Sequence, residues 1–176
     1  MELPAARRLF ALDHGFPQPI VAVLGEYTPD VELVPIEQID ERMPDLDDWE
    51  VLLALRHHRR PWDGLVTTDS GMVRTPESLA VVLQTKLTLV VAMEAGHDML
   101  KATGLLFAYL PGILGRTDPG VAQLWKLQAA NRPHTPPWDE LRRVAEHGNQ
   151  EVDELWAEAR LSDEALGRDP LGGAES

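Results

Sequence analysis

The sequence contains no cysteine, which excludes a disulfide framework and a thiolate site for catalysis or metal binding. Long hydrophobic runs are missing as well: GLLFAYLPGIL (residues 104–114) is far shorter than a membrane span and contains Pro111. The N-terminal MELPAARRLFALD has too short an apolar stretch for a signal peptide. We therefore expect a cytoplasmic protein with no membrane partner.

Basic residues are scarce, with 16 Lys and Arg against 29 Asp and Glu, so the formal net charge is -13 at pH 7. This balance weakens any function that requires broad attraction to phosphate backbones, and a nucleic-acid function would need a local basic patch or metal ions. The densest basic cluster is RHHRR (residues 56–60), where Arg56, Arg59 and Arg60 are candidates for holding an RNA backbone. The alternative is a helix C-terminus enriched in cations, as the helix dipole favours.

The composition is that of a globular protein, since 44% of the 176 residues are hydrophobic and 26% are charged. The length suffices for one domain with a buried core. Apolar runs predict strands at 8–13, 31–36, 62–69 and 87–94, and helical patterns occupy 17–27, 47–60, 75–86 and 98–110. Strands that alternate with helices favour an α/β fold with a mainly parallel sheet and helices on both faces.

The last part of the chain is predicted to differ from this alternating pattern. Residues 121–132, 136–148 and 150–161 are predicted to be helical, and prolines separate the first two of these segments. We therefore divide the chain into an α/β domain (1–116), a helical extension (117–162) and a flexible tail (163–176). The acidic residues of the C-terminal part are expected on solvated helix faces. One alternative is that this part packs against the domain or a second copy as an interaction arm, and a bolder one is that its carboxylates cover the functional crevice and compete with nucleic acid.

Two of the predicted strands end on an aspartate, RLFALD on Asp13 and WDGLVTTD on Asp69. Because the carboxyl ends of parallel strands lie at one edge of a sheet, both side chains should face the same crevice. Asp48 stands at the start of the helix between these strands and could project over that edge. Three carboxylates form a hard oxygen site of the kind that holds Mg²⁺ or Mn²⁺, which activates water and neutralises phosphate charge. The ordinary alternatives are a helix N-cap at Asp47 or Asp48 and a turn that begins at Asp69.

These segments resemble the PIN-like nuclease domains, especially the compact bacterial branch often found as toxins of toxin–antitoxin pairs. ALDHGFPQPIVAVL (residues 11–24) is similar to that branch's first strand and helix, DWEVLLAL places Asp48 before Val51, and LVTTD is similar to its strand ending LVTxD. The resemblance covers residues 8 to about 115.

The resemblance implies a three-layer α/β/α sandwich and a divalent-metal-dependent ribonuclease that cleaves single-stranded RNA. It implies Mg²⁺ or Mn²⁺ as the cofactor and Asp13, Asp48 and Asp69 as catalytic metal ligands. An antitoxin protein and a second copy of the chain are the partners that it leaves open.

The sequence departs from the family pattern at two positions. His14 stands where the family usually has an acid, and Gly71 stands where a second carboxylate follows LVTxD. A replacement metal ligand could come from Glu94, at the end of a predicted strand, or from His97 or Asp98 just beyond it. His14 itself is either a ligand or proton shuttle near the metal, or a polar residue on a turn.

The missing acids and the negative charge favour a second hypothesis, a PIN-like scaffold with an incomplete site that acts as a binding or assembly module. Haloacid-dehalogenase-like hydrolases and response-regulator receivers are disfavoured, because both require further acids at the first strand that this chain lacks.

Overall fold

Strands and helices alternate along most of the chain. The computed structural model describes residues 7–14, 18–93, 95, 98–116, 118–128 and 134–172. The strands within these ranges are β1 (Arg8–Leu12), β2 (Val31–Pro35), β3 (Gly64–Thr67), β4 (Thr88–Ala92), β5 (Gln123–Leu127) and β6 (His134–Thr135). The helices are α1 (Gln18–Tyr27), α2 (Ile36–Ile39), α3 (Asp48–His57), α4 (Pro76–Thr85), α5 (Met99–Leu114), α6 (Pro137–His147), α7 (Val152–Ala159) and α8 (Asp163–Leu166). Short 3₁₀ helices are η1 (Met43–Asp45) and η2 (Ser70–Val73).

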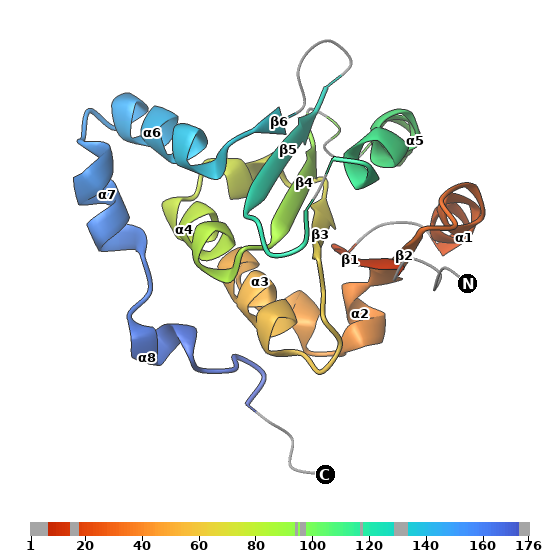
Figure 1. The fold of residues 1–176 in the computed structure, drawn as a ribbon, viewed down its shortest axis with the longest axis horizontal. Coiled ribbons are helices and arrows are strands. Elements are labelled where there is room, and N and C mark those ends of the chain that lie inside the picture. Colours follow the sequence, from red (N-terminus) through yellow and green to blue (C-terminus); the bar gives the residue numbers. More distant parts are fainter. Residues whose placement is uncertain are drawn as a thin grey trace, which may run out of the picture.

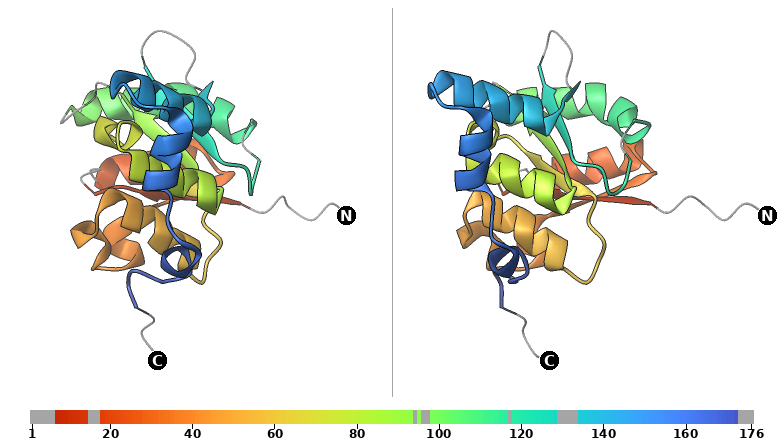
Figure 2. Two further views of the ribbon diagram at one scale, coloured as in Figure 1. Left: turned by 90° about the vertical axis from the view of Figure 1, so that its left-hand side faces the viewer. Right: turned by 60° about the vertical axis from the view of Figure 1, so that its left-hand side comes forward.

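The strands form one sheet in the order β2-β1-β3-β4-β5-β6, in which β6 alone is antiparallel to its neighbour. Helices α1 and α5 cover one face, and α3, α4 and α6 cover the other, with α7 beyond them (Figures 1 and 2). This arrangement confirms the predicted three-layer α/β/α sandwich with a mainly parallel sheet.

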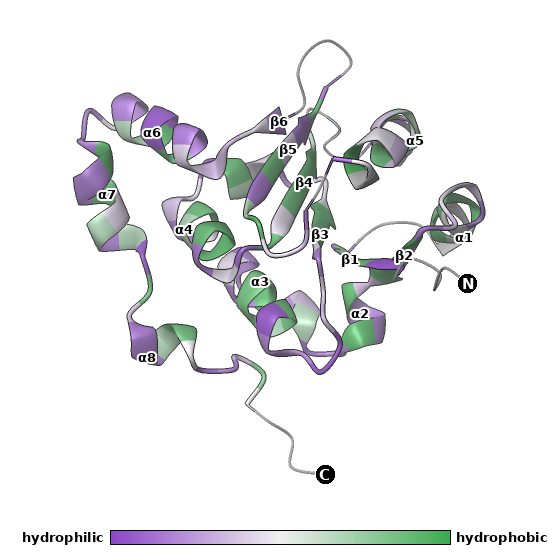
Figure 3. Cartoon of the chain, in the orientation of Figure 1, coloured by the Kyte–Doolittle hydropathy of each residue, from purple (hydrophilic) through white to green (hydrophobic). Residues whose placement is uncertain are grey.

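The central strands are buried on both faces because helices cover both sides of the sheet. Along β1, Phe10 and Leu12 pack toward α1 and α5, whereas Leu9 and Ala11 pack toward α3 and α4. The inner strands are accordingly hydrophobic over most of their length, and the polar residues concentrate on the outer helices (Figure 3). Two apolar cores therefore hold the sheet between its helical layers.

Residues 121–132 were predicted to form a helix, and this prediction is wrong for β5. Residues Gln123–Leu127 pair with β4 in parallel, with Leu124 opposite Leu89 and Trp125 opposite Val90. The outer edge of β4 presents backbone groups that must find hydrogen-bond partners, and this long-range pairing outweighs the local helical pattern. The sheet therefore extends beyond residue 116, where the sequence predicted the α/β domain to end.

Residues 160–172, which we call the C-terminal arm, lie against the α/β layers (Figure 2). The Gln84 side-chain amide donates to the carbonyl oxygen of Leu161 (3.2 Å) and accepts from its backbone N–H (3.1 Å). His57 Nε2 donates to the carbonyl oxygen of Leu166 (2.9 Å), and Arg42 donates to that of Leu171 (2.7 Å). The predicted tail thus includes α8 and an anchored segment up to residue 172, and residues 173–176 lie outside the described residues.

Candidate active site

The candidate site lies at the carboxyl ends of β1 and β3. The chain passes from β1 to β2 on one side and then crosses to β3 on the other, so the strand order reverses at β1 and β3. Open parallel sheets bind ligands at such a switch point, outside the carboxyl ends of the strands. Asp13 follows β1 directly, and its backbone N–H donates to the carbonyl oxygen of Val66 (2.8 Å).

Thr67, the last residue of β3, joins two of the predicted aspartates. Its hydroxyl donates to Asp13 Oδ2 (2.5 Å) and accepts from the backbone N–H of Asp69 (2.9 Å). Thr67 is completely buried, so this short bond is shielded from competing water. Sequence reasoning missed Thr67, although the motif LVTTD contains it: a hydroxyl at the buried end of a strand is placed to orient a neighbouring strand-end carboxylate.

His14 contacts the other oxygen of Asp13. The backbone N–H of His14 donates to Asp13 Oδ1 (2.8 Å), and its ring Nδ1 lies 3.2 Å from the same oxygen. The His14 side chain is 69% exposed and that of Asp13 is 15% exposed. His14 therefore lies at the solvent side of Asp13, where an imidazole can exchange protons with water.

Asp69 begins the 3₁₀ helix η2, as the turn interpretation expected. Its Oδ1 accepts from the backbone N–H of Gly71 (2.6 Å), whereas its Oδ2 has no hydrogen-bond partner among the described residues. A Cβ at position 71 would lie 2.8 Å from Asp69 Oδ1. Glycine at position 71, where the family pattern has a carboxylate, thus permits this close turn.

Asp47, and not Asp48, is the N-cap residue of α3. Its backbone N–H donates to the Glu50 carboxylate (2.9 Å), and Asp48 is the first residue of the helix. Burial raises the pKa of Asp48, and the negative charges of Asp69 and Asp13 raise it further. The three carboxylates therefore share one electrostatic environment, and the Asp48 side chain is not occupied by capping.

The oxygens of the three aspartates suit a hard cation in type, but they are not arranged as a ready site. Among the described residues, no group of three His, Asp or Glu side chains is placed to hold a metal ion. Both oxygens of Asp13 and one of Asp69 already accept hydrogen bonds. Each carboxylate oxygen keeps a further lone pair after it accepts one hydrogen bond, so an ion requires these side chains to come closer together and does not require them to lose their present partners.

The other predicted ligands do not add to this group. Glu94 and His97 lie outside the described residues. Asp98 is the N-cap of α5, and its Oδ1 accepts from the backbone N–H of Lys101 (3.0 Å). Its carboxylate therefore has a structural function in the conformation present.

The basic cluster lies near the amino ends of the strands, whereas the aspartates lie at their carboxyl ends. Helix α3 begins at Asp48 and ends at His57, from which the chain leads to the start of β3. Arg60 pairs with Glu32 (2.8 Å) and lies over the ring of Trp62 (5.5 Å to the centroid). The structure thus does not bring Arg56, Arg59 and Arg60 together with the three carboxylates.

The C-terminal arm also lies away from the three carboxylates. It contacts the C-terminal ends of α3 and α4, which precede the starts of β3 and β4. The hypothesis that the acidic C-terminal part covers the site is therefore wrong for the arm.

A cavity of about 440 Å³ adjoins the candidate site. It is lined by residues that include Asp48, Trp49, Thr75, Glu77 and Ser78. Carboxylates and an aromatic ring, without any cation, surround this space. Its lining therefore suits a cation or a group with N–H donors better than a phosphate.

No family model matches the chain, and searches of curated proteins and of solved structures found no match. Within the described part of the chain, no helix has the length and apolar character that crossing a membrane requires.

Proposed function

We propose that this protein is a divalent-metal-dependent ribonuclease of the PIN-like type, with Asp13, Asp48 and Asp69 as the residues that hold Mg²⁺ or Mn²⁺. The observation that carries the proposal is the pair of linked aspartates at the switch point, beside a third carboxylate whose pKa they raise. Burial and neighbouring carboxylates together raise the pKa of Asp48, and carboxylates perturbed in this way cluster at functional sites.

Each residue of the site would have a separate role in the proposed reaction. Asp13 is oriented by Thr67, so one carboxylate is fixed at the end of β1. The Asp48 carboxylate and Oδ2 of Asp69 are the metal-binding oxygens that the surrounding residues constrain least. A bound divalent cation supplies a water nucleophile at neutral pH and neutralises charge on the phosphodiester. His14, which is exposed and beside Asp13, can accept or deliver a proton at the edge of the site.

The proposed substrate is single-stranded RNA, whose flexible backbone can reach a site at the rim of the sheet. If the protein is a toxin, its partner is an antitoxin protein. The other proposed partner is a second copy of the chain, with which it would form a homodimer. These finer parts rest on the resemblance to the compact bacterial branch.

A PIN-like scaffold that binds or assembles without cleavage is the second candidate. It is favoured by His14 and Gly71, which stand where the family pattern has acids, and by the net charge of -13. An acidic surface repels RNA unless cations intervene.

The deciding experiment is cleavage of a labelled single-stranded RNA with Mg²⁺ or Mn²⁺ by the intact chain, together with calorimetric Mn²⁺ titration. Asp13→Asn and Asp69→Asn should each reduce cleavage at least about 100-fold while the fold is retained, because second-shell changes alone cost 10–100-fold. Asp30→Asn is the matched control, since Asp30 is an exposed aspartate in a turn before β2.

Cleavage that persists in both site variants would refute the assigned residues. If neither the intact chain nor Asp13→Asn binds Mn²⁺ at millimolar concentration and no RNA is cut, the scaffold function replaces the nuclease.

A further inference from the structure

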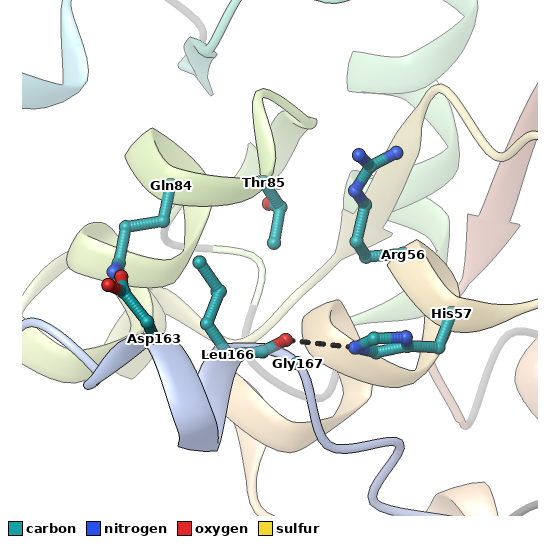
Figure 4. Close-up of a pocket in the computed structure, with 7 residues that line it drawn as sticks. All are labelled: Arg56, His57, Gln84, Thr85, Asp163, Leu166 and Gly167. Carbon is teal, nitrogen blue, oxygen red and sulfur yellow. Dashed lines mark hydrogen bonds between the residues drawn. The ribbon is translucent and has the colours of Figure 1, made fainter.

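Two adjoining cavities lie at the amino ends of the strands, on the side away from the three carboxylates. The larger, of about 630 Å³, lies between α3, α4 and the C-terminal arm and is lined by Arg56, His57, Gln84, Thr85, Asp163 and Leu166, among others (Figure 4). The smaller, of about 190 Å³, shares Arg56 and Thr85 with it and is also lined by Trp62 and Lys86. The shared residues place Arg56 at the junction of the two spaces.

The side chain of Trp62 provides a hydrogen-bond donor without an acceptor. Trp62 is 6% exposed, and its indole N–H is buried with no hydrogen-bond partner among the described residues. Contacts from His58 (5.7 Å between ring centroids) and Arg60 hold the ring. Because this N–H has almost no accessible surface, the Trp62 ring contributes an apolar wall to the smaller cavity, and the polar contacts of a ligand there must come from other side chains.

The charges that line the smaller cavity favour an anion. Arg56 and Lys86 are exposed cations, and neither has an ion pair with a described residue. Asp63 also lines the cavity, but its carboxylate is occupied by Arg8 (3.1 Å) and by the backbone N–H of Leu9 (2.7 Å). Asp163 lines the larger cavity together with Arg56 and His57, so the smaller cavity is the more cationic of the two.

The larger cavity suits the remainder of a small molecule. Its volume falls in the range of about 300–1,000 Å³ that is typical of small-molecule sites. Figure 4 shows Leu166 of the arm between Gln84 and the side chains of α3, with the hydrogen bond from His57 to the arm backbone along one side. Because the arm is anchored over this space, a compact ligand fits it better than a polymer.

We propose that this end of the molecule binds a small phosphate monoester. The phosphate lies in the smaller cavity against Arg56 and Lys86, and the body of the ligand lies in the larger cavity under the arm. The site is separate from the three carboxylates and does not depend on the proposed nuclease function.

The test is calorimetric titration of the full chain with inorganic phosphate, with the four ribonucleoside 5′-monophosphates and glucose 6-phosphate, and with adenosine as an uncharged probe. At least one monoester should bind more than tenfold tighter than inorganic phosphate, and adenosine should not bind. Arg56→Gln and Lys86→Gln should each weaken that monoester at least fivefold. Each substitution removes one positive charge and keeps a polar side chain at an exposed position, so it tests the anion contact directly.

Arg59→Gln is the matched control, because Arg59 belongs to the same basic cluster and lines neither cavity. It should leave the affinity unchanged, as should Asp30→Asn at the exposed turn before β2. The proposal is overturned if no monoester binds below 1 mM, if phosphate binds as tightly as every monoester, or if Arg59→Gln weakens binding as much as Arg56→Gln. Circular dichroism of each variant verifies that it is folded.

Discussion

Replacing Thr67 by valine tests the connection between the two strand-end aspartates. Valine matches threonine in shape but removes the hydroxyl that donates to Asp13 Oδ2 (2.5 Å) and accepts from the Asp69 N–H (2.9 Å). A hydrogen bond to a charged group contributes about 1.5–3 kcal/mol, and the Asp69 N–H also loses its acceptor. The added methyl regains about 0.8 kcal/mol of burial. We expect the free energy of unfolding to fall by about 2 kcal/mol.

The measurement is urea unfolding at pH 7 followed by tryptophan fluorescence. The matched control is Thr68→Val, because Thr68 is half-buried and its hydroxyl has no hydrogen bond to a described residue; its unfolding free energy should change by less than about 0.5 kcal/mol. RNA cleavage by the Thr67→Val protein should fall about 10–100-fold, since Asp13 loses the partner that orients it. Equal stability of the two variants would refute the argument that Thr67 fixes the site.

Two further predictions concern the same layer of the molecule. Asp48→Asn should be more stable than the natural chain at pH 7, because burial and then Asp69 and Asp13 raise the pKa of Asp48, so its ionised form disfavours the fold. The advantage should disappear below the ordinary pKa of 3.8, where Asp48 is protonated in both states; urea unfolding at several pH values measures it, and an equal or lower stability at pH 7 contradicts it. Gly64→Ala should cost about 3 kcal/mol or more, because the new Cβ would lie 1.9 Å from the Thr88 carbonyl oxygen in the neighbouring strand. If the free energy of unfolding of Gly64→Ala is within about 1 kcal/mol of that of the natural chain, then β3 and β4 can separate at this point, contrary to the prediction.

The candidate site could be predicted from the sequence as far as Asp13, Asp48 and Asp69. Each ends an apolar strand or begins a helix, and such positions follow from local periodicity. That they lie within one another's electrostatic influence follows from the rule that parallel strands end at the same edge. The hydrogen bonds of their carboxylate oxygens could not be predicted. They depend on how close Thr67 and Gly71 lie to these oxygens in the folded chain, which sequence spacing does not indicate.

For the basic cluster, the sequence predicted the local structure but not its position relative to the aspartates. RHHRR predicted a helix that ends in cations, and α3 does end there. Its distance from the aspartates depends on the direction of α3, which carries the chain back toward the start of β3. Likewise, the unpartnered N–H of Trp62 and the anchored arm result from contacts between segments far apart in the chain.

The amino-acid sequence by itself determined the alternation of strands and helices, the three-layer sandwich and the aspartates at the strand ends, because hydrophobic periodicity and end signals are local properties of the chain. Only the tertiary structure decided that residues 123–127 are a strand, that Thr67 joins Asp13 to Asp69, and that Arg56 and Trp62 border a cavity under the C-terminal arm. These features depend on hydrogen bonds and packing between segments far apart in the sequence, and such interactions outweigh local preference wherever a buried polar group must find its partner.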